Sequence, residues 1–249
     1  MATDPYNVIV MGAASGIGAA AAGHLAAQGI RVFGMDRNLS AMQALADTVR
    51  RAGHALEASG ADITEPASVD AAIDAVARKA GQIHGLVNCA GITGITNIKG
   101  HEVSLEDFDR VYAINLRGAL VVSQAILRHM LPHGYGRILH VASIAGKEGN
   151  AGMAAYSATK AGLIGLVKSI AKDYPETGIT INALAPAVIR TPLVDALPDA
   201  TVKYMTDKIP MRRVGELSEA AEMIAWIVSP ACSFTTGFTF DLTGGRATY

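Results

Sequence analysis

Tyr156 and Lys160 are the residues whose types and spacing most directly suggest chemistry. They are four positions apart, so a helix would place the phenol and the ammonium group on one face. A phenol with its usual pKa of about 10 is a poor base near neutrality, but a neighbouring cation favours the phenolate and lowers that pKa. The pair therefore predicts a tyrosine that exchanges a proton with a bound molecule, although the same spacing also occurs on ordinary solvated helix faces.

A glycine-rich turn near the N-terminus predicts a phosphate-binding loop. The apolar run 8–11 leads into Gly12, Gly16 and Gly18 and then into an alanine-rich stretch, which is the order strand, turn and helix. Glycines let the backbone approach a pyrophosphate closely, and the N-terminus of the next helix offers unpaired N–H groups. The spacing Gly-x-x-x-Gly-x-Gly matches the common dinucleotide fingerprint only in part. A plain connecting turn would also explain two of the glycines.

Length and composition favour a single domain that binds a small molecule. The chain has 249 residues, half of them apolar, and its formal net charge is -1. Because it has no block of Lys and Arg, no nucleic-acid partner is expected. Cys89 and Cys232 fit neither a disulfide framework nor a zinc site, so we expect no metal and a reducing, cytoplasmic location. The uncharged stretch 5–30 contains glycines and polar residues, so no membrane segment is expected.

Short β-rich apolar runs alternate with longer helical stretches, which is typical of a parallel sheet covered on both faces. We therefore predict an α/β fold, with one doubly wound Rossmann-type domain over 1–249. The expected strands are 7–11, 30–35, 54–59, 84–88, 136–142, 178–184 and 237–240. The interval 192–215 has weak periodicity and three prolines. It predicts a mobile flap with a short helix over a substrate site, or else a plain surface loop.

The distinctive polar residues fall at the expected strand ends, where ligands bind in such sheets. The glycine turn follows the first strand, and 186–191 follow the sixth. The second to fifth strands end at or just before Asp36, Asp62, Asn88 and Ser143, respectively. Asn115 lies in the helix before the fifth strand. Taken singly, each has an ordinary explanation as a turn residue, a strand-end hydroxyl or a helix kink. Their shared placement predicts one binding edge.

Together these motifs resemble those of the short-chain dehydrogenase/reductase family over essentially the whole chain. The resemblance implies a catalytic tetrad of Asn115, Ser143, Tyr156 and Lys160, with the glycine turn as the phosphate loop. It also relates the stretch 88–91 to that family's Asn-Asn-Ala-Gly motif. Three residues depart from the pattern: Met11 replaces a Thr, Cys89 an Asn and Ala187 a Gly. We expect altered packing or cofactor affinity from these changes, with the reaction type retained.

NAD is the expected cofactor because of Asp36, which lies eighteen residues beyond Gly18. Its carboxylate would accept hydrogen bonds from the adenosine ribose and repel a 2′-phosphate. Arg37 would partly attract that phosphate, whereas Ser15 stands where NADP-preferring relatives often carry a basic residue. The residues expected to contact NAD are Gly12, Ser15, Gly16, Ile17, Gly18, Asp36, Asp62, Ile63, Asn88, Ala90, Gly91, Tyr156, Lys160, Pro186, Ile189 and Thr191.

The expected reaction is hydride transfer between the nicotinamide and a secondary alcohol or ketone, with Tyr156 as the acid or base. Lys160 would lower the pKa of Tyr156 and, as the resemblance implies, bind the nicotinamide ribose. Ser143 would orient the reacting oxygen, and Asn115 would hold a water that links Lys160 to solvent.

The expected substrate contacts are Ser143, Glu148, Asn150 and Tyr156. Lys147 and Arg190 make this region polar, and the strings 146–150 and 241–249 resemble those of relatives that act on sugars, sugar acids and polyols, including 2-keto-3-deoxy sugar acids. A 3-oxoacyl-thioester reductase is the alternative within the family, disfavoured by Asp36 and the neutral charge balance. A non-catalytic sensor of the dinucleotide is the alternative from another class, disfavoured by the complete Ser, Tyr and Lys set.

The resemblance also implies a homotetramer. The stretch 161–170 is apolar nearly all round, which is typical of a helix buried on two sides. The tail that ends at Tyr249 is expected to cross to a neighbouring subunit, with Arg246 or Tyr249 near the pocket.

Overall fold

A seven-stranded sheet forms the centre of the computed structural model, which describes residues 5–196 and 198–249. Every neighbouring pair of strands is parallel, and the strand order is β3-β2-β1-β4-β5-β6-β7. The strands are β1 (Asn7–Met11), β2 (Arg31–Asp36), β3 (Leu56–Gly60), β4 (Gly85–Asn88), β5 (Gly136–Val141), β6 (Ile179–Pro186) and β7 (Thr239–Leu242). This architecture confirms the predicted α/β Rossmann-type fold class.

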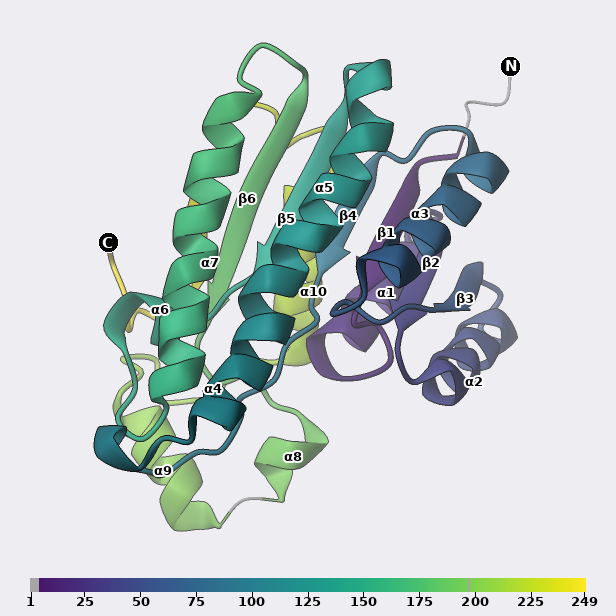
Figure 1. Ribbon diagram of the computed structural model, residues 1–249. Coiled ribbons are helices and arrows are strands. Elements are labelled where there is room, and N and C mark those ends of the chain that lie inside the picture. The colour runs from purple at the N-terminus through teal and green to yellow at the C-terminus, as the bar shows by residue number, and fades with distance from the viewer. Residues whose placement is uncertain (1–4, 197) are drawn as a thin grey trace.

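Helices cover both faces of this sheet. They are α1 (Gly16–Ala27), α2 (Leu39–Arg51), α3 (Pro66–Ala80), α4 (Leu105–Tyr112), α5 (Gly118–Met130), α6 (Ala145–Glu148), α7 (Ala154–Asp173), α8 (Pro192–Asp195), α9 (Asp199–Asp207) and α10 (Leu217–Ile227). Figure 1 shows α3, α5 and α7 side by side on the near face, with α1 and α10 behind the sheet. One layer is thus built from α3, α5 and α7 in the middle of the chain, and the other from α1, α2 and α10 nearer its two ends.

Two apolar clusters, one on each face, hold these layers together. In β1, Ile9 and Met11 belong to the cluster under α3, α5 and α7, whereas Val8 and Val10 belong to the cluster under α1, α2 and α10. All four side chains are buried, as expected for a strand covered on both faces. Full burial of each such side chain contributes about 1.5–3 kcal/mol relative to exposure. The sheet is therefore a rigid platform for whatever lies at its edge.

The predicted strand boundaries are mostly right within two residues, and the differences have local causes. β2 begins at Arg31, because the Ile30 N–H bonds to Leu25 O at the end of α1 (3.2 Å). β7 begins at Thr239, because Gly237 has φ +71 and forms a turn. β6 continues to Pro186, because the Pro186 carbonyl still accepts from Ile144 N (2.9 Å) beyond the expected end of the strand.

The segment 192–215 lies beyond the carboxyl ends of the strands, at the bottom of Figure 1. It contains two short helices, α8 and α9, where one was expected. Position 197 of this predicted flap and positions 1–4 of the predicted domain lie outside the described residues. Within the described ranges, no helix combines the length and apolar character needed to cross a membrane.

Candidate active site

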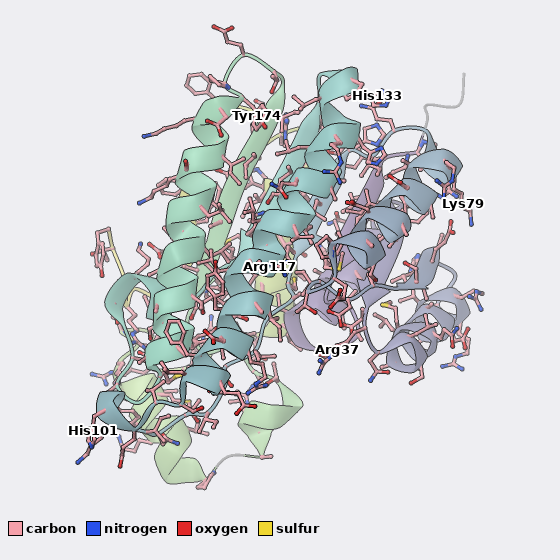
Figure 2. All side chains as sticks on the ribbon, viewed as in Figure 1. Arg37, Lys79, His101, Arg117, His133 and Tyr174 are labelled. Atoms are coloured by element: carbon pink, nitrogen blue, oxygen red, sulfur yellow. The ribbon has the colours of Figure 1, made fainter. Side chains whose placement is uncertain are left out.

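A cavity of about 510 Å³ opens at the carboxyl edge of the sheet. It is bounded by the loops that follow β1, β2, β3, β4, β5 and β6, and by the start of α7. Its lining residues are Met11, Gly12, Ser15, Gly16, Ile17, Gly18, Asp36, Arg37, Ala61, Asp62, Ile63, Thr64, Cys89, Ala90, Gly91, Ile92, Thr93, Ile114, Val141, Ala142, Ser143, Tyr156, Lys160, Pro186, Ala187 and Thr191. Figure 2 labels Arg37 at this lower edge and His133 and Tyr174 at the opposite edge.

The glycine turn forms one wall of the cavity by close backbone packing. Gly12 has φ +74, and a Cβ there would lie 2.6 Å from Ala90 N. A Cβ on Gly18 would collide with the carbonyl oxygen of Gly12. Neither position therefore accepts another residue, and the turn presents bare backbone and the N-terminus of α1 to the cavity. This cradle fits the pyrophosphate of a dinucleotide.

Asp36 ends β2 at the far side of the glycine turn. One carboxylate oxygen accepts from Ala14 N (3.2 Å) and the other from Asn38 N (2.9 Å). These two bonds join the glycine turn to the start of α2 and fix the carboxylate at the cavity. The neighbouring Arg37 is exposed and also lines the cavity. An acceptor of fixed orientation is what a ribose diol requires.

Ser143, Tyr156 and Lys160 meet at the opposite end of the cavity. Ser143 follows β5, and its hydroxyl accepts from Ala145 N (3.1 Å) at the start of α6. A Cβ on Gly146 would lie 2.6 Å from the backbone carbon of Lys160, so α6 packs directly on α7. The ammonium of Lys160 is buried and donates to Val141 O (2.7 Å), 5.7 Å from the centre of the Tyr156 ring. The predicted pair therefore does share one face of α7.

Burial governs the protonation of this pair. It raises the pKa of Tyr156 above its ordinary value, while the hydrogen bond with Ser143 lowers it in part. It also lowers the pKa of Lys160 to about 8, because the ammonium is withdrawn from water. The pKa of Tyr156 is therefore raised in the protein alone, and the expected lowering by Lys160 stays a prediction. The ammonium of Lys160 donates to the carbonyl oxygen of Val141.

Asn115 lies in a π-helical turn, Ala113–Arg117, between α4 and α5. Its side-chain amide bonds both backbone groups of Ile92 (each 2.9 Å) and Thr159 Oγ1 (3.2 Å). A Cβ on Gly91 would lie 3.2 Å from Asn115 Oδ1 and 3.3 Å from Lys160 Nζ. Asn115 thus fastens the loop after β4 beside Lys160. Its predicted water-holding role stays a prediction.

Two of the expected cofactor contacts do not line the cavity. Asn88 is buried at the end of β4, where its amide contacts His140 and the Ala90 N–H. Ile189 is buried and contacts Gly215, across an isolated β-bridge. Asp62 does line the cavity, and its carboxylate is held by the N–H and hydroxyl of Thr64. The remaining expected contacts also line it.

Several cavity residues were not predicted as contacts. They are Met11, Arg37, Ala61, Thr64, Cys89, Ile92, Thr93, Ile114, Val141, Ala142 and Ala187. Most are apolar or small and lie at the end of a predicted strand or within five residues after it, so strand-end placement was the only signal available. Burial raises the pKa of the Cys89 thiol to about 12, which keeps it neutral.

Glu148 and Asn150, the expected substrate contacts after Ser143, are bound by the chain's own tail. Arg246 donates to Glu148 Oε2 (2.8 Å) and to Asn150 Oδ1 (3.0 Å), and its side chain is only 9% exposed. Neither Glu148 nor Asn150 lines the cavity. Lys147 likewise pairs with Asp241 (2.9 Å). The polar character of this segment therefore serves contacts with the tail.

One further expectation about this region needs correction, and another stays a prediction. Arg190, expected to make the pocket polar, pairs with Asp195 and Glu216 on the exposed surface. Tyr249 donates its hydroxyl to Lys147 O of its own chain (3.2 Å). Arg246 and Tyr249 thus contact the segment after Ser143 of their own chain, and the expected crossing of the tail to a neighbouring subunit stays a prediction.

Comparison with known proteins agrees with this arrangement. The family model described as enoyl-(acyl carrier protein) reductase, adh_short_C2, matches residues 12–246. A 2-dehydro-3-deoxy-L-rhamnonate dehydrogenase (NAD(+)) from a Sphingomonas species is 42% identical, over 97% of this chain and 95% of that protein. The chain belongs to the short-chain dehydrogenase/reductase family. The resemblance identified from the motifs is thereby confirmed.

Other members of this family are also similar. The 3-oxoacyl-(acyl-carrier-protein) reductase FabG of Escherichia coli is 34% identical, over 95% of both chains. Among solved structures, an actinorhodin polyketide ketoreductase variant with NADPH has a TM-score of 0.93 at 31% identity and covers both chains fully. An NAD+-bound xylitol dehydrogenase has a TM-score of 0.91 at 30% identity, over 98% of this chain and all of that one. The same fold thus serves both cofactors in these relatives.

The three departures from the family's motifs leave the local backbone intact. Met11 is buried in the core, and its carbonyl accepts from Cys89 N (2.9 Å). Ala187 donates its N–H to Leu242 O (2.9 Å). Main-chain bonds therefore hold these positions, and their effect on cofactor affinity stays a prediction.

Proposed function

We propose that this protein is an NAD-dependent oxidoreductase that interconverts a secondary alcohol and a ketone in a small sugar acid. The observation that carries the proposal is one cavity with a fixed carboxylate, Asp36, at one end and Ser143, Tyr156 and Lys160 at the other. Similarity to the Sphingomonas dehydrogenase supports the choice of a 2-keto-3-deoxy sugar acid. Sugars and polyols are the neighbouring substrate classes.

The cavity fits NAD, whose bound nicotinamide would accept or donate a hydride. The glycine turn would hold the pyrophosphate, since Gly12, Gly16 and Gly18 leave its backbone uncovered. Asp36 would accept hydrogen bonds from the adenosine ribose, and Lys160 would donate to the nicotinamide ribose. The other proposed contacts are Ser15, Ile17, Asp62, Ile63, Ala90, Gly91, Tyr156, Pro186 and Thr191, with Asn88 and Ile189 acting from behind the cavity wall.

Proton transfer is assigned to Tyr156. In oxidation its phenolate takes the proton of the substrate hydroxyl, and in reduction its phenol returns one to the carbonyl oxygen. Ser143 donates to the same oxygen and stabilises the negative charge that develops there. Because burial raises the pKa of Tyr156, the protein alone favours the neutral phenol, which is the form that reduction needs.

Lys160 is assigned to stabilise the phenolate when oxidation requires it. Lowering a tyrosine pKa from about 10 to about 7 takes about 4 kcal/mol, and burial adds to that requirement. Lys160 reaches its full charge only below its lowered pKa of about 8. Asn115 is assigned to hold a water that links this ammonium to solvent.

A plate of candidate substrates tests the reaction class. NADH formation or consumption would be followed with 2-keto-3-deoxy sugar acids and their alcohols, polyols, and 3-oxoacyl and 3-hydroxyacyl thioesters. We expect turnover with a sugar acid or polyol and with NAD over NADP. Preference for thioesters with NADP would support the FabG-like alternative. Tight NAD binding without any turnover would support the sensor.

The proposal extends to architecture and assembly. We propose one domain over 1–249 with 192–215 as its substrate-binding flap, a cytoplasmic location in keeping with two free cysteines, and a homotetramer. Two half-exposed aromatic side chains, Trp226 and Phe238, pack against Phe240 of the edge strand β7. An apolar surface at the edge of a sheet supports contact with another subunit. Light scattering that gives a stable monomer would refute the tetramer.

A further inference from the structure

A buried polar chain runs behind the cavity, away from the residues already assigned to chemistry. His140 lies in β5, directly opposite Asn88 of β4 in the strand register. Its side chain is 1% exposed, and Asn88 and Ser123 beside it are 3% and 0% exposed. Polar groups this deep are costly unless each one is bonded. The bonds they make therefore define their protonation states.

Hydrogen bonding fixes the tautomer of His140. The Ser123 hydroxyl lies 2.8 Å from Ala119 O, a pure acceptor, so it spends its single proton there. Its oxygen must then accept from His140 Nε2, which lies 2.9 Å away. His140 therefore carries a proton on Nε2. Because Ala90 N is a fixed donor to Asn88 Oδ1, Asn88 turns its Nδ2 toward His140 Nδ1, which must then be the unprotonated acceptor of a neutral ring.

His140 Nδ1 and the Ala90 N–H together fix the side-chain amide of Asn88. Asn88 Nδ2 lies 3.1 Å from His140 Nδ1 and donates to it. The amide oxygen then faces the turn after β4, where it accepts from Ala90 N (3.2 Å). A donor in place of His140 Nδ1 would require the amide to rotate and leave Ala90 N without its acceptor.

Ala90 and Gly91 are the residues through which this chain reaches the cavity. A Cβ on Gly12 would lie 2.6 Å from Ala90 N and 2.8 Å from Ala90 Cα, so the turn after β4 presses directly on the glycine turn. Gly91 is equally close to the side chains of Asn115 and Lys160. A shift of Ala90 would therefore act first on the glycine turn, where the contact is closest.

We propose that His140 is a positioning residue for the dinucleotide, which acts by orienting Asn88 so that the turn at Ala90 and Gly91 fits against the glycine turn. The inference rests on the proposed function only in requiring that NAD binds in the cavity. Burial, together with the positive charge of Lys160, lowers the pKa of His140 to about 4, in keeping with the neutral form. Turnover is not needed for the inference to hold.

Two substitutions of His140 separate positioning from packing. In His140→Asn the amide oxygen replaces Nδ1 and keeps the acceptor for Asn88, while the link to Ser123 is lost. In His140→Gln the amide replaces Nε2 and keeps the link to Ser123, while the acceptor for Asn88 is lost. Each variant removes one buried hydrogen bond, so their losses of stability should be similar, and thermal unfolding would verify that both are folded.

The dissociation constant of NAD, measured by calorimetry on the folded variants, is the deciding quantity. We expect His140→Gln to weaken NAD binding about tenfold, the scale of one misplaced buried contact, and His140→Asn to stay within about threefold of the parent. In the active enzyme, KM for NAD should rise in the Gln variant while kcat at saturating NAD stays nearly unchanged. Leu139→Val is the control for packing, because it removes a methylene group from the core on the opposite face of β5. It should lower stability without changing NAD affinity.

Equal NAD affinities in the Asn and Gln variants would overturn the proposal, whether both match the parent or both are weakened. NAD affinity that responds as expected in a protein that turns over no substrate would refute the proposed reaction and leave the positioning role intact. Absence of NAD binding by the parent protein would overturn both.

Discussion

Replacing Asp36 with Asn should reverse much of the preference for NAD over NADP. The carboxylate is held by Ala14 N at 3.2 Å and Asn38 N at 2.9 Å, so its charge stays fixed at the cavity. At about 4 Å and an effective dielectric of about 20, one pair of like charges costs about 4 kcal/mol, or about 1000-fold in binding. Because the site is partly exposed, salt reduces that value, and we expect a change of about 10- to 1000-fold.

The measurement is the ratio of kcat/KM with NADP to kcat/KM with NAD, at low and at high salt. The change on Asp36→Asn should be larger at low salt, because screening weakens the repulsion. Adding Arg37→Ala should reverse part of the gain with NADP, since the exposed guanidinium is the cation nearest in sequence. Asp47→Asn on α2 is a matched control for net charge, because Asp47 pairs with Arg50 on the exposed surface and does not line the cavity. An unchanged ratio in Asp36→Asn would refute this account of cofactor choice.

Three further predictions concern the other end of the cavity and its support. Because the pKa of His140 is lowered to about 4, the unfolded chain binds a proton at this residue before the folded protein does as pH falls from about 6.5 to about 4. The parent should therefore lose up to about 3 kcal/mol of stability in that range, and His140→Asn should not. Equal pH dependence of the free energy of unfolding in urea for the two proteins would contradict this. Arg246→Lys should raise the substrate KM several-fold with kcat little changed. A lysine cannot bridge Glu148 and Asn150, so the segment that follows Ser143 would be held less firmly beside the substrate. An unchanged substrate KM would count against this. Lys160→Met should lower oxidation by about 100-fold or more and weaken NAD binding, and a change in neither would remove Lys160 from the site.

Local motifs predicted much of the site because the required groups are close in the sequence. The glycine turn follows β1 directly, and a parallel sheet brings the ends of its strands to one edge. Tyr156 and Lys160 share one helix face by spacing alone. Asp36 ends its strand beside the glycine turn for the same topological reason.

Contacts between distant segments were not predictable in this way. Arg246 meets Glu148 and Asn150 across almost a hundred residues, so these side chains appeared free for substrate. The π-helical turn at Asn115 depends on its bonds to Ile92 in another loop. The pKa of Tyr156 depends on how deeply the fold buries the phenol, which spacing does not determine.

The central claim is that the phenol of Tyr156 transfers the proton of the substrate. Tyr156→Phe removes only the hydroxyl and keeps the ring in place on α7. The deciding experiment measures NAD affinity and kcat of this variant with the best substrate of the panel. Our account predicts NAD affinity within about threefold of the parent and turnover lower by at least about 100-fold. Turnover close to that of the parent would contradict it.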